Sequence, residues 1–263
     1  MKAVFGPVDS WQLGRVLCVD MAMSDRKYCT FDCIYCPQRR ATRGMTRRRW
    51  FVPLSWVEAQ ISSFVPEEAD WVTFTGRGEP TLASNLGQTI DYAKAHLGRP
   101  IAVLTNSSLL PRDDVKNDLA KADMVVAKLD APNEDLFRAI NRPFGSISLA
   151  DIVGALREFR GGYGGRLALQ LTLLEANRPA AKELAAIARS IAPDEVQLNT
   201  GASRRLVVEM PKELERICDL FAGLNLTGIA PGEPPEQRAA VVRDLPWIRR
   251  ANTEVMLMGL PAA

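Results

Sequence analysis

The feature that most constrains this chain is a repeated alternation between apolar runs of strand length and helical patterns. The two alternate six times before about residue 200. Runs that are rich in Val, Ile and Leu at every position suit parallel strands whose two faces are both buried. The alternation therefore predicts an α/β fold with a parallel sheet, arranged as a whole or partial barrel or as an open doubly wound sheet.

The expected strands cover residues 14–21, 70–75, 100–105, 123–129, 166–174 and 194–199. The expected helices cover residues 55–65, 84–96, 111–122, 133–140, 148–160 and 179–191. Beyond residue 200 this rhythm ends, and a helical segment at 211–224 is followed by a Pro- and Gly-containing stretch at 229–237. We therefore expect a core domain over residues 1–200 and a C-terminal extension over 201–263 that contributes to substrate choice.

Composition limits the class of protein. The chain has 263 residues, of which 47% are hydrophobic and 24% charged, so it can bury a full core without disulfide bonds. Its net charge of +2 does not by itself favour a nucleic-acid or membrane partner. We expect neither a signal peptide in the first residues nor a membrane span, because the sequence shows no apolar run before a cleavage site and no apolar stretch near the length that spans a bilayer. Five cysteines, three of them clustered, favour a reducing compartment, so we expect a cytoplasmic protein.

Polar residues occur where each expected strand ends. In parallel α/β folds, ligand sites form at the carboxyl ends of the strands. The residues at these ends are the loop from Cys29 to Cys36, Gly76 to Pro80, Thr105 to Ser108, Lys128 with Asp130, Gln170 with Thr172, and Gln197 with Asn199 and Thr200. Taken singly, each has a structural alternative, such as a turn cap around Asn106 or an ion pair between Lys128 and Asp130. Their common location predicts a functional site.

The segment "CTFDCIYC" holds Cys29, Cys33 and Cys36 with the spacing C-x3-C-x2-C. Cysteine thiolates bind zinc ions or iron–sulfur clusters, and a structural zinc site is usually closed by four protein ligands. The remaining candidates for a fourth ligand are expected to be packing or surface residues: His96, Cys18 and Cys218. Three protein ligands leave one coordination position open for a substrate or a cofactor.

With Tyr35 directly before the last cysteine, this spacing resembles the signature of the radical S-adenosylmethionine (SAM) superfamily. The resemblance implies a partial (β/α)6 TIM-like barrel and a [4Fe-4S] cluster held by the three cysteines. It further implies that the open iron binds the amino and carboxylate groups of SAM. One electron, from a donor such as flavodoxin or ferredoxin, would cleave SAM to methionine and a 5′-deoxyadenosyl radical, which abstracts hydrogen from the substrate.

The same resemblance extends to other segments. "GRGEP" is similar to the glycine-rich motif of the family, in which Gly76 and Gly78 allow a close backbone approach and Glu79 accepts a hydrogen bond from the SAM ammonium group. The resemblance further implies a set of residues that bind the cofactor or line its pocket: Tyr35, Asn106, Asp130 and Asn199. We assign no catalytic side chain from the sequence.

Over residues 4–200 the motifs resemble iron–sulfur oxidoreductases related to the wyosine-base tRNA synthases. Those synthases carry a second cluster on further N-terminal cysteines, whereas only Cys18 precedes Cys29 here. We therefore expect neither the second cluster nor the tRNA reaction that depends on it.

The sequence leaves the substrate class open. The resemblance and six arginines between residues 39 and 49, which are typical of a phosphate-binding segment, suit a tRNA or nucleotide substrate. The alternative for the arginines is a solvated loop in which they pair with acids. The nearly neutral charge suits a peptide or protein substrate instead, as for maturases or glycyl-radical activases. A non-enzymatic zinc or iron–sulfur binding module is the remaining alternative.

Overall fold

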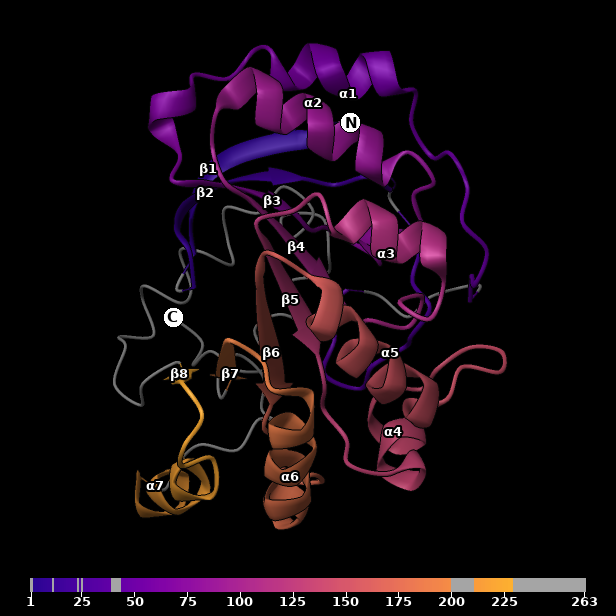
Figure 1. Ribbon diagram of the computed structural model, residues 1–263. Coiled ribbons are helices and arrows are strands. Elements are labelled where there is room, and N and C mark those ends of the chain that lie inside the picture. The colour runs from indigo at the N-terminus through magenta and orange to yellow at the C-terminus, as the bar shows by residue number, and fades with distance from the viewer. Residues whose placement is uncertain are drawn as a thin grey trace, which may run out of the picture.

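The computed structural model describes residues 2–10, 12–22, 24, 26–38, 44–199 and 211–228. Its centre is an eight-stranded sheet in the order β1 to β8. The first two strands are antiparallel, and every later pair of neighbours is parallel. The sheet curls into a half-barrel, and the helices follow one another around its outer side (Figure 1). This confirms the predicted partial parallel barrel.

The strands are β1 (Val4–Ser10), β2 (Gly14–Val19), β3 (Trp71–Phe74), β4 (Ile101–Thr105), β5 (Met124–Lys128), β6 (Arg166–Thr172), β7 (Glu195–Asn199) and β8 (Leu226–Gly228). The α-helices are α1 (Leu54–Ile61), α2 (Leu86–Leu97), α3 (Asp113–Leu119), α4 (Glu134–Ile140), α5 (Leu149–Gly162), α6 (Ala181–Ile191) and α7 (Pro211–Leu220). The described residues also form the short 3-10 helices η1 (Pro66–Glu68), η2 (Pro80–Leu82) and η3 (Arg178–Ala180).

Local sequence signals fix several helix ends. The side chain of Asn133 accepts a hydrogen bond from the N–H of Leu136 at the start of α4, and Ser148 does the same for Asp151 in α5. α2 ends at Gly98, whose φ of 59° lies in the left-handed region that glycine adopts without strain. These caps place α2, α4 and α5 where the apolar pattern predicts them.

The parallel strands bury side chains on both faces. Val103 and Val125 pack in the large core between the sheet and the helices, whereas Ala102 and Val126 pack in a second cluster on the other face. Because successive side chains on a strand point to opposite faces, a strand covered on both sides needs an apolar residue at almost every position. This is the physical origin of the continuous apolar runs in the sequence.

The N-terminal segment forms a strand that the sequence pattern did not predict. β1 contains Gly6 and Pro7 and carries a register shift between Phe5 and Val8. A proline is tolerated here because β1 is the edge strand of the sheet and the irregularity removes the need for its N–H. The hairpin also reaches β7, because the Gln12 side chain donates to the side-chain oxygen of Gln197.

The C-terminal described segment continues the sheet. β8 pairs with β7, and Phe221, just after α7, is fully buried. Thr200, residues 201–210 and residues 229–263 lie outside the described residues, so the predicted boundary at 200 and the role of the extension stay predictions. Within the described parts of the chain, no helix has the length and apolar character needed to cross a bilayer.

Candidate functional site

The loop that carries the three cysteines follows β2 and is docked on the end of α4. The N–H of Asp32 lies 3.1 Å from the carbonyl oxygens of both Asn141 and Arg142, and the N–H of Ile34 donates to the carbonyl of Ile140 at 2.9 Å. These backbone bonds join segments more than 100 residues apart in sequence. The C-terminal turn of α4 therefore forms one wall of the cysteine loop.

Nitrogen donors surround the cysteine sulfurs. The backbone N–H of Phe31 and the side-chain amide of Asn106 each lie 3.5 Å from Cys29 Sγ. The side-chain amide of Asn141 lies 3.5 Å from Cys33 Sγ. Donors directed at sulfur favour the negatively charged thiolate, which is the form that binds metals.

The charge state of the loop follows from burial. Burial raises the pKa of Cys29 to about 12 and that of Cys33 to about 11, so both bare thiols hold their protons at neutral pH. Burial of Lys27 acts to lower its pKa, but the charges that Cys36, Cys29 and Cys33 carry as thiolates and a hydrogen bond to Cys36 outweigh burial, and the pKa of Lys27 is raised. The ammonium group of Lys27 therefore lies near enough to the cysteine loop to interact with its thiols.

Three cysteine sulfurs on one loop have the chemistry of ligands to an iron–sulfur cluster. Among the described residues, no three His, Cys, Asp or Glu side chains converge on one metal position. A cluster distributes its thiolate ligands over different irons, so it does not require such convergence. The other candidate ligands lie elsewhere: Cys18 is buried within β2, His96 stacks on Tyr92 of α2, and Cys218 lies on α7.

The "GRGEP" segment follows β3 and packs directly against the residues that precede the cysteines. A Cβ added to Gly78 would lie 1.7 Å from the carbonyl oxygen of Tyr28, and one added to Gly76 would lie 2.3 Å from Cγ of Asp20. The N–H of Glu79 donates to the same Tyr28 carbonyl at 2.9 Å. Both glycines are therefore required by close contacts with the end of β2 and the start of the cysteine loop.

Glu79 is buried and binds groups of the neighbouring loops. Its Oε1 accepts bonds from the backbone N–H and the hydroxyl of Thr81, at 3.1 and 2.7 Å, and from the hydroxyl of Thr105 at 2.6 Å. Its Oε2 accepts a bond from the N–H of Asn106 at 2.8 Å. Burial raises its pKa while these bonds act to lower it. Glu79 thus ties together the ends of β3 and β4, and its contact with SAM stays a prediction.

Asn106 both caps its own turn and contacts the cysteine loop. Its Oδ1 accepts a bond from the N–H of Ser108 at 3.0 Å, as a turn cap does. Its Nδ2 donates to the hydroxyl of Thr30 at 2.7 Å, in addition to its contact with Cys29. Asn106 therefore caps its turn, which was the structural alternative, and it also lies beside the cysteine loop.

Asp130 is a fully buried carboxylate that accepts bonds from several elements. The hydroxyl of Tyr35 donates to it, the amide of Asn141 donates to its Oδ2 at 2.9 Å, and the N–H of Thr172 donates to its Oδ1 at 2.8 Å. Lys128 Nζ lies 3.7 Å away and forms the ion pair that was the structural alternative. Burial, followed by the charge of Asp130, raises the pKa of Tyr35 well above its usual range. Asp130 therefore orients Tyr35 and Asn141 beside the cysteines.

Sequence reasoning missed Asn141. The signal was a helical pattern that stops at residue 140 and is followed by "NRP", because a helix usually ends shortly before a proline. That signal predicts a helix end and contains nothing about a cysteine some 100 residues earlier. Only the folded chain shows that this helix end meets the cysteine loop.

The polar residues of β5, β6 and β7 lie in register. Lys128 is paired with Gln170, which is paired with Gln197, and Thr172 is paired with Asn199. Lys128 Nζ donates to the hydroxyl of Thr172 at 2.7 Å and to Gln170 Oε1 at 3.3 Å. The structure thus brings the predicted polar strand ends together on one edge of the sheet, as expected.

The described arginines of the 39–49 segment have different environments. Arg48 has only 6% of its side chain exposed, and it pairs with Asp114 and Asp118 and donates to the carbonyls of Thr81 and Ala83. The alternative of arginines paired with acids is therefore right for Arg48. Arg47 and Arg49 are exposed, and Arg39, Arg40 and Arg43 lie outside the described residues.

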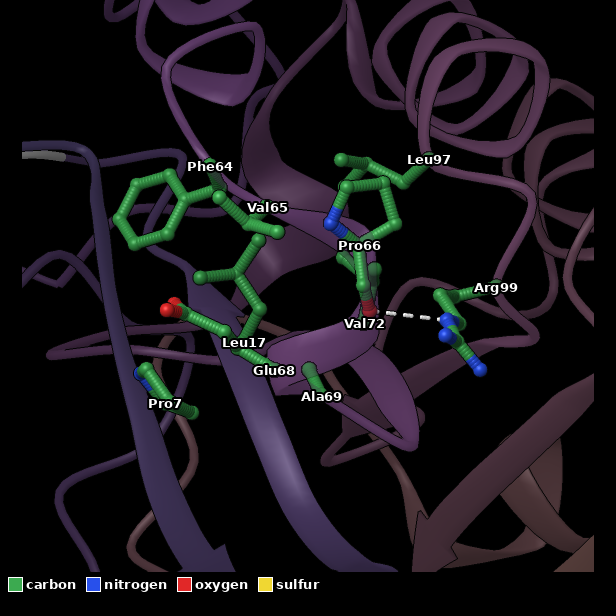
Figure 2. Close-up of a pocket in the computed structure, with 10 residues that line it drawn as sticks. All are labelled: Pro7, Leu17, Phe64, Val65, Pro66, Glu68, Ala69, Val72, Leu97 and Arg99. Carbon is green, nitrogen blue, oxygen red and sulfur yellow. Dashed lines mark hydrogen bonds between the residues drawn. The ribbon is translucent and has the colours of Figure 1, made fainter.

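A pocket lies apart from these residues (Figure 2). Its lining comes from β1 to β3, η1 and the end of α2, and includes Leu17, Val72 and Leu97. Arg99 closes one side by donating to the carbonyl of Pro66 at 2.9 Å, drawn as the dashed line in Figure 2. None of the predicted site residues lines this pocket.

Comparison with known proteins identifies a matching family and two related proteins. The model of the "Radical SAM superfamily" matches residues 24–174. A UPF0026 protein of Synechocystis sp. is 34% identical over 89% of this chain and 84% of its own length. A UPF0026 protein of Methanocaldococcus jannaschii is 33% identical over 86% of this chain and 72% of its own length.

A solved structure shares the fold. The crystal structure of a radical SAM methyltransferase from Sphaerobacter thermophilus superposes with a TM-score of 0.59 at 18% identity, covering 82% of this chain and 67% of that one. The family match includes the cysteine loop, "GRGEP", Asn106 and Asp130. The chain therefore belongs to the radical SAM superfamily, as an enzyme whose cofactors are S-adenosylmethionine and a [4Fe-4S] cluster.

Proposed function

We propose that Cys29, Cys33 and Cys36 are the ligands of the [4Fe-4S] cluster and that the iron without a protein ligand binds SAM. When bound, the cluster supplies the electron that cleaves SAM to methionine and a 5′-deoxyadenosyl radical, which abstracts hydrogen from the substrate. The observation that carries the proposal is that buried amide donors lie 3.5 Å from the sulfurs of Cys29 and Cys33, two cysteines of one short loop.

We propose separate roles for the residues around the cluster. Lys27 brings a positive charge to the thiolates, which offsets the charge that accumulates when the thiols lose their protons. Gly76 and Gly78 allow the loop after β3 to approach the cysteine loop, and this leaves the backbone between them close to the cluster ligands. We propose that Glu79 binds the ammonium group of SAM. Its Oε2 accepts only one of the four hydrogen bonds that this carboxylate receives from the protein.

Anaerobic reconstitution with iron and sulfide tests this assignment. We expect about four irons per chain and production of 5′-deoxyadenosine when SAM and a reductant are added. Cys29→Ala, Cys33→Ala and Cys36→Ala should each abolish both the cluster and SAM cleavage. Cys218→Ala, on α7, should retain both, and a cluster that survives loss of any one of the three loop cysteines would contradict the assignment.

The enzyme needs a reductant and a substrate. For the reductant we propose a small electron-transfer protein such as flavodoxin or ferredoxin, since the cluster must receive one electron for each SAM that is cleaved. Reduced flavodoxin or ferredoxin should support 5′-deoxyadenosine formation at a rate that saturates with its concentration. If dithionite supports 5′-deoxyadenosine formation and neither flavodoxin nor ferredoxin does, this part of the proposal is contradicted.

For the substrate, one surface feature favours a nucleic acid. Arg47, Arg49 and Trp50 are exposed, and Trp50 has 57% of its surface accessible. The guanidinium of Arg49 lies 5.4 Å from the ring centre of Tyr28 and 4.9 Å from that of Phe51. Exposed cations beside an exposed aromatic ring are suited to phosphates and stacked bases.

Transfer RNA binding at two salt concentrations tests this substrate class. Because phosphate contacts release counterions, we expect affinity to fall steeply as salt rises, and Arg47→Ala with Trp50→Ala to weaken binding. Binding that is absent or insensitive to salt would favour the peptide or protein substrate instead. That second class predicts a polypeptide that copurifies with the enzyme and gains or loses atoms when SAM is cleaved.

An isotope experiment finds the substrate without assuming its class. The reconstituted enzyme is incubated with fractions of a deuterated cell extract, and 5′-deoxyadenosine is analysed for deuterium. The fraction that transfers deuterium contains the substrate, because the abstracted hydrogen comes from it. Treatment of that fraction with ribonuclease or protease then distinguishes the two classes.

A further inference from the structure

Two asparagine side chains direct their amides at two different cysteine sulfurs. Asn106, after β4, lies 3.5 Å from Cys29 Sγ through its Nδ2, and Asn141, at the end of α4, lies 3.5 Å from Cys33 Sγ in the same way. Both asparagines are buried, so water does not compete for these N–H groups. They approach the cysteine loop from separate elements of the fold.

Each amide is oriented by a second, oxygen partner. Asn106 Nδ2 donates to the hydroxyl of Thr30 at 2.7 Å, and Asn141 Nδ2 donates to Oδ2 of Asp130 at 2.9 Å. A side-chain amide has two N–H groups, so a bond of one to oxygen fixes the direction of the other. In both residues the second N–H is therefore held toward sulfur by the protein itself.

A hydrogen bond to a cluster sulfur affects the two redox states unequally. Reduction adds one negative charge, part of which resides on the sulfur ligands, and a donor binds a more negative acceptor more strongly. The reduced cluster is therefore stabilised more than the oxidised cluster, and its reduction potential rises. Removal of such a donor lowers the potential.

We propose that Asn106 and Asn141 set the reduction potential of the cluster by donating to the thiolates of Cys29 and Cys33. The inference rests on the proposed function, since it requires these two cysteines to be cluster ligands. Both asparagines act through the cysteines and are positioning residues. The electron itself comes from the external reductant, and no bond to either asparagine forms or breaks.

The variants Asn106→Leu and Asn141→Leu remove the donors while keeping a side chain of similar size. In a redox titration followed by electron paramagnetic resonance, each should retain its iron and show a lower potential than the wild type. We expect the ratio of reduced to oxidised cluster at a fixed potential to fall by up to about tenfold, or ~59 mV for one electron. Variants with full iron content and the wild-type potential would overturn the proposal.

Asn133→Ala is the matched control, because Asn133 caps the other end of α4 and contacts no sulfur in the described structure. Its potential should equal that of the wild type. If the asparagine variants fail to hold a cluster, the proposal is tested instead on wild-type protein labelled with ¹⁵N-asparagine. Its reduced cluster should show a magnetic coupling to amide nitrogen, and absence of that coupling would overturn the proposal.

The same experiments distinguish this inference from the function on which it rests. A wild-type protein that takes up no cluster contradicts the assignment of the cysteines. A normal cluster that cleaves SAM, combined with unchanged potentials and no nitrogen coupling, contradicts only the role of the two asparagines.

Discussion

At the residue scale, Gly78 decides how closely the loop after β3 approaches the cysteine loop. A side chain there would overlap the carbonyl oxygen of Tyr28, a backbone atom that cannot rotate away. We expect Gly78→Ala to destabilise the protein by about 1–3 kcal/mol, the usual range for overpacking, and to reduce the iron bound per chain. Chemical unfolding and iron analysis measure the two effects.

Gly154 provides the control for that substitution. It lies within α5, and a Cβ added there would meet nothing within 4 Å. Since alanine has the higher helix propensity, Gly154→Ala should stabilise the protein by up to about 1 kcal/mol and leave iron binding unchanged. Equal effects of Gly78→Ala and Gly154→Ala on stability and iron content would show that the contact with Tyr28 determines neither.

Arg48 and Arg47 are neighbours in sequence with opposite expected effects. The side chain of Arg48 is buried and bound to Asp114, Asp118 and two carbonyl oxygens, so Arg48→Ala removes the partner of Asp118 and of both carbonyls, whereas the half-exposed Asp114 keeps Arg112. We expect a loss of about 3 kcal/mol in the free energy of unfolding. Arg47→Ala, at an exposed position, should change it by less than about 0.5 kcal/mol. Similar losses for both variants would contradict the structural role of Arg48.

At the element scale, the β1–β2 hairpin at one end of the sheet contacts β7, which is next to the last strand. Gln12 in the hairpin donates to Gln197 on β7, a buried residue. In a double-mutant cycle with Gln12→Ala and Gln197→Ala, we expect a coupling of about 1 kcal/mol in the free energy of unfolding. Additive effects would mean that the hairpin and β7 are stabilised independently.

Elements with long apolar runs could be predicted from the sequence, and the strands β1 and β8 could not. β4 and β5 have apolar residues on both faces, which is a strong signal. β1 contains Gly6 and Pro7, which usually indicate a turn, and β8 has only three residues. These strands depend on pairing with β2 and β7, and pairing partners are not encoded locally.

In the candidate site, too, some residues could be predicted from the sequence and others could not. The cysteines, "GRGEP" and Asn106 could be found because each follows a recognisable strand. The position of Asn141 could not, because the contact between the end of α4 and the cysteine loop depends on tertiary packing. The buried state of Glu79 and Asp130 was equally hidden, since a sequence shows a carboxylate but not its hydrogen-bond partners.

At the scale of the whole molecule, the curved sheet collects residues from five strand ends at one edge. The three loop cysteines follow β2, the glycine motif follows β3, Asn106 follows β4, and Asp130 and Thr172 lie at the ends of β5 and β6. Parallel strands make this possible, because all their carboxyl ends lie on the same side of the fold. Under the proposed function, this edge of the half-barrel would supply the three cysteine ligands and leave the last coordination position of the cluster to SAM.

The most direct test of this account is electron–nuclear double resonance on the reduced, reconstituted protein with SAM labelled with ¹⁵N at its amino group or ¹⁷O at its carboxylate. We predict a coupling between the cluster and each label, because the iron without a cysteine ligand binds both groups. A cluster of four irons that shows neither coupling, while SAM is bound, would contradict the account.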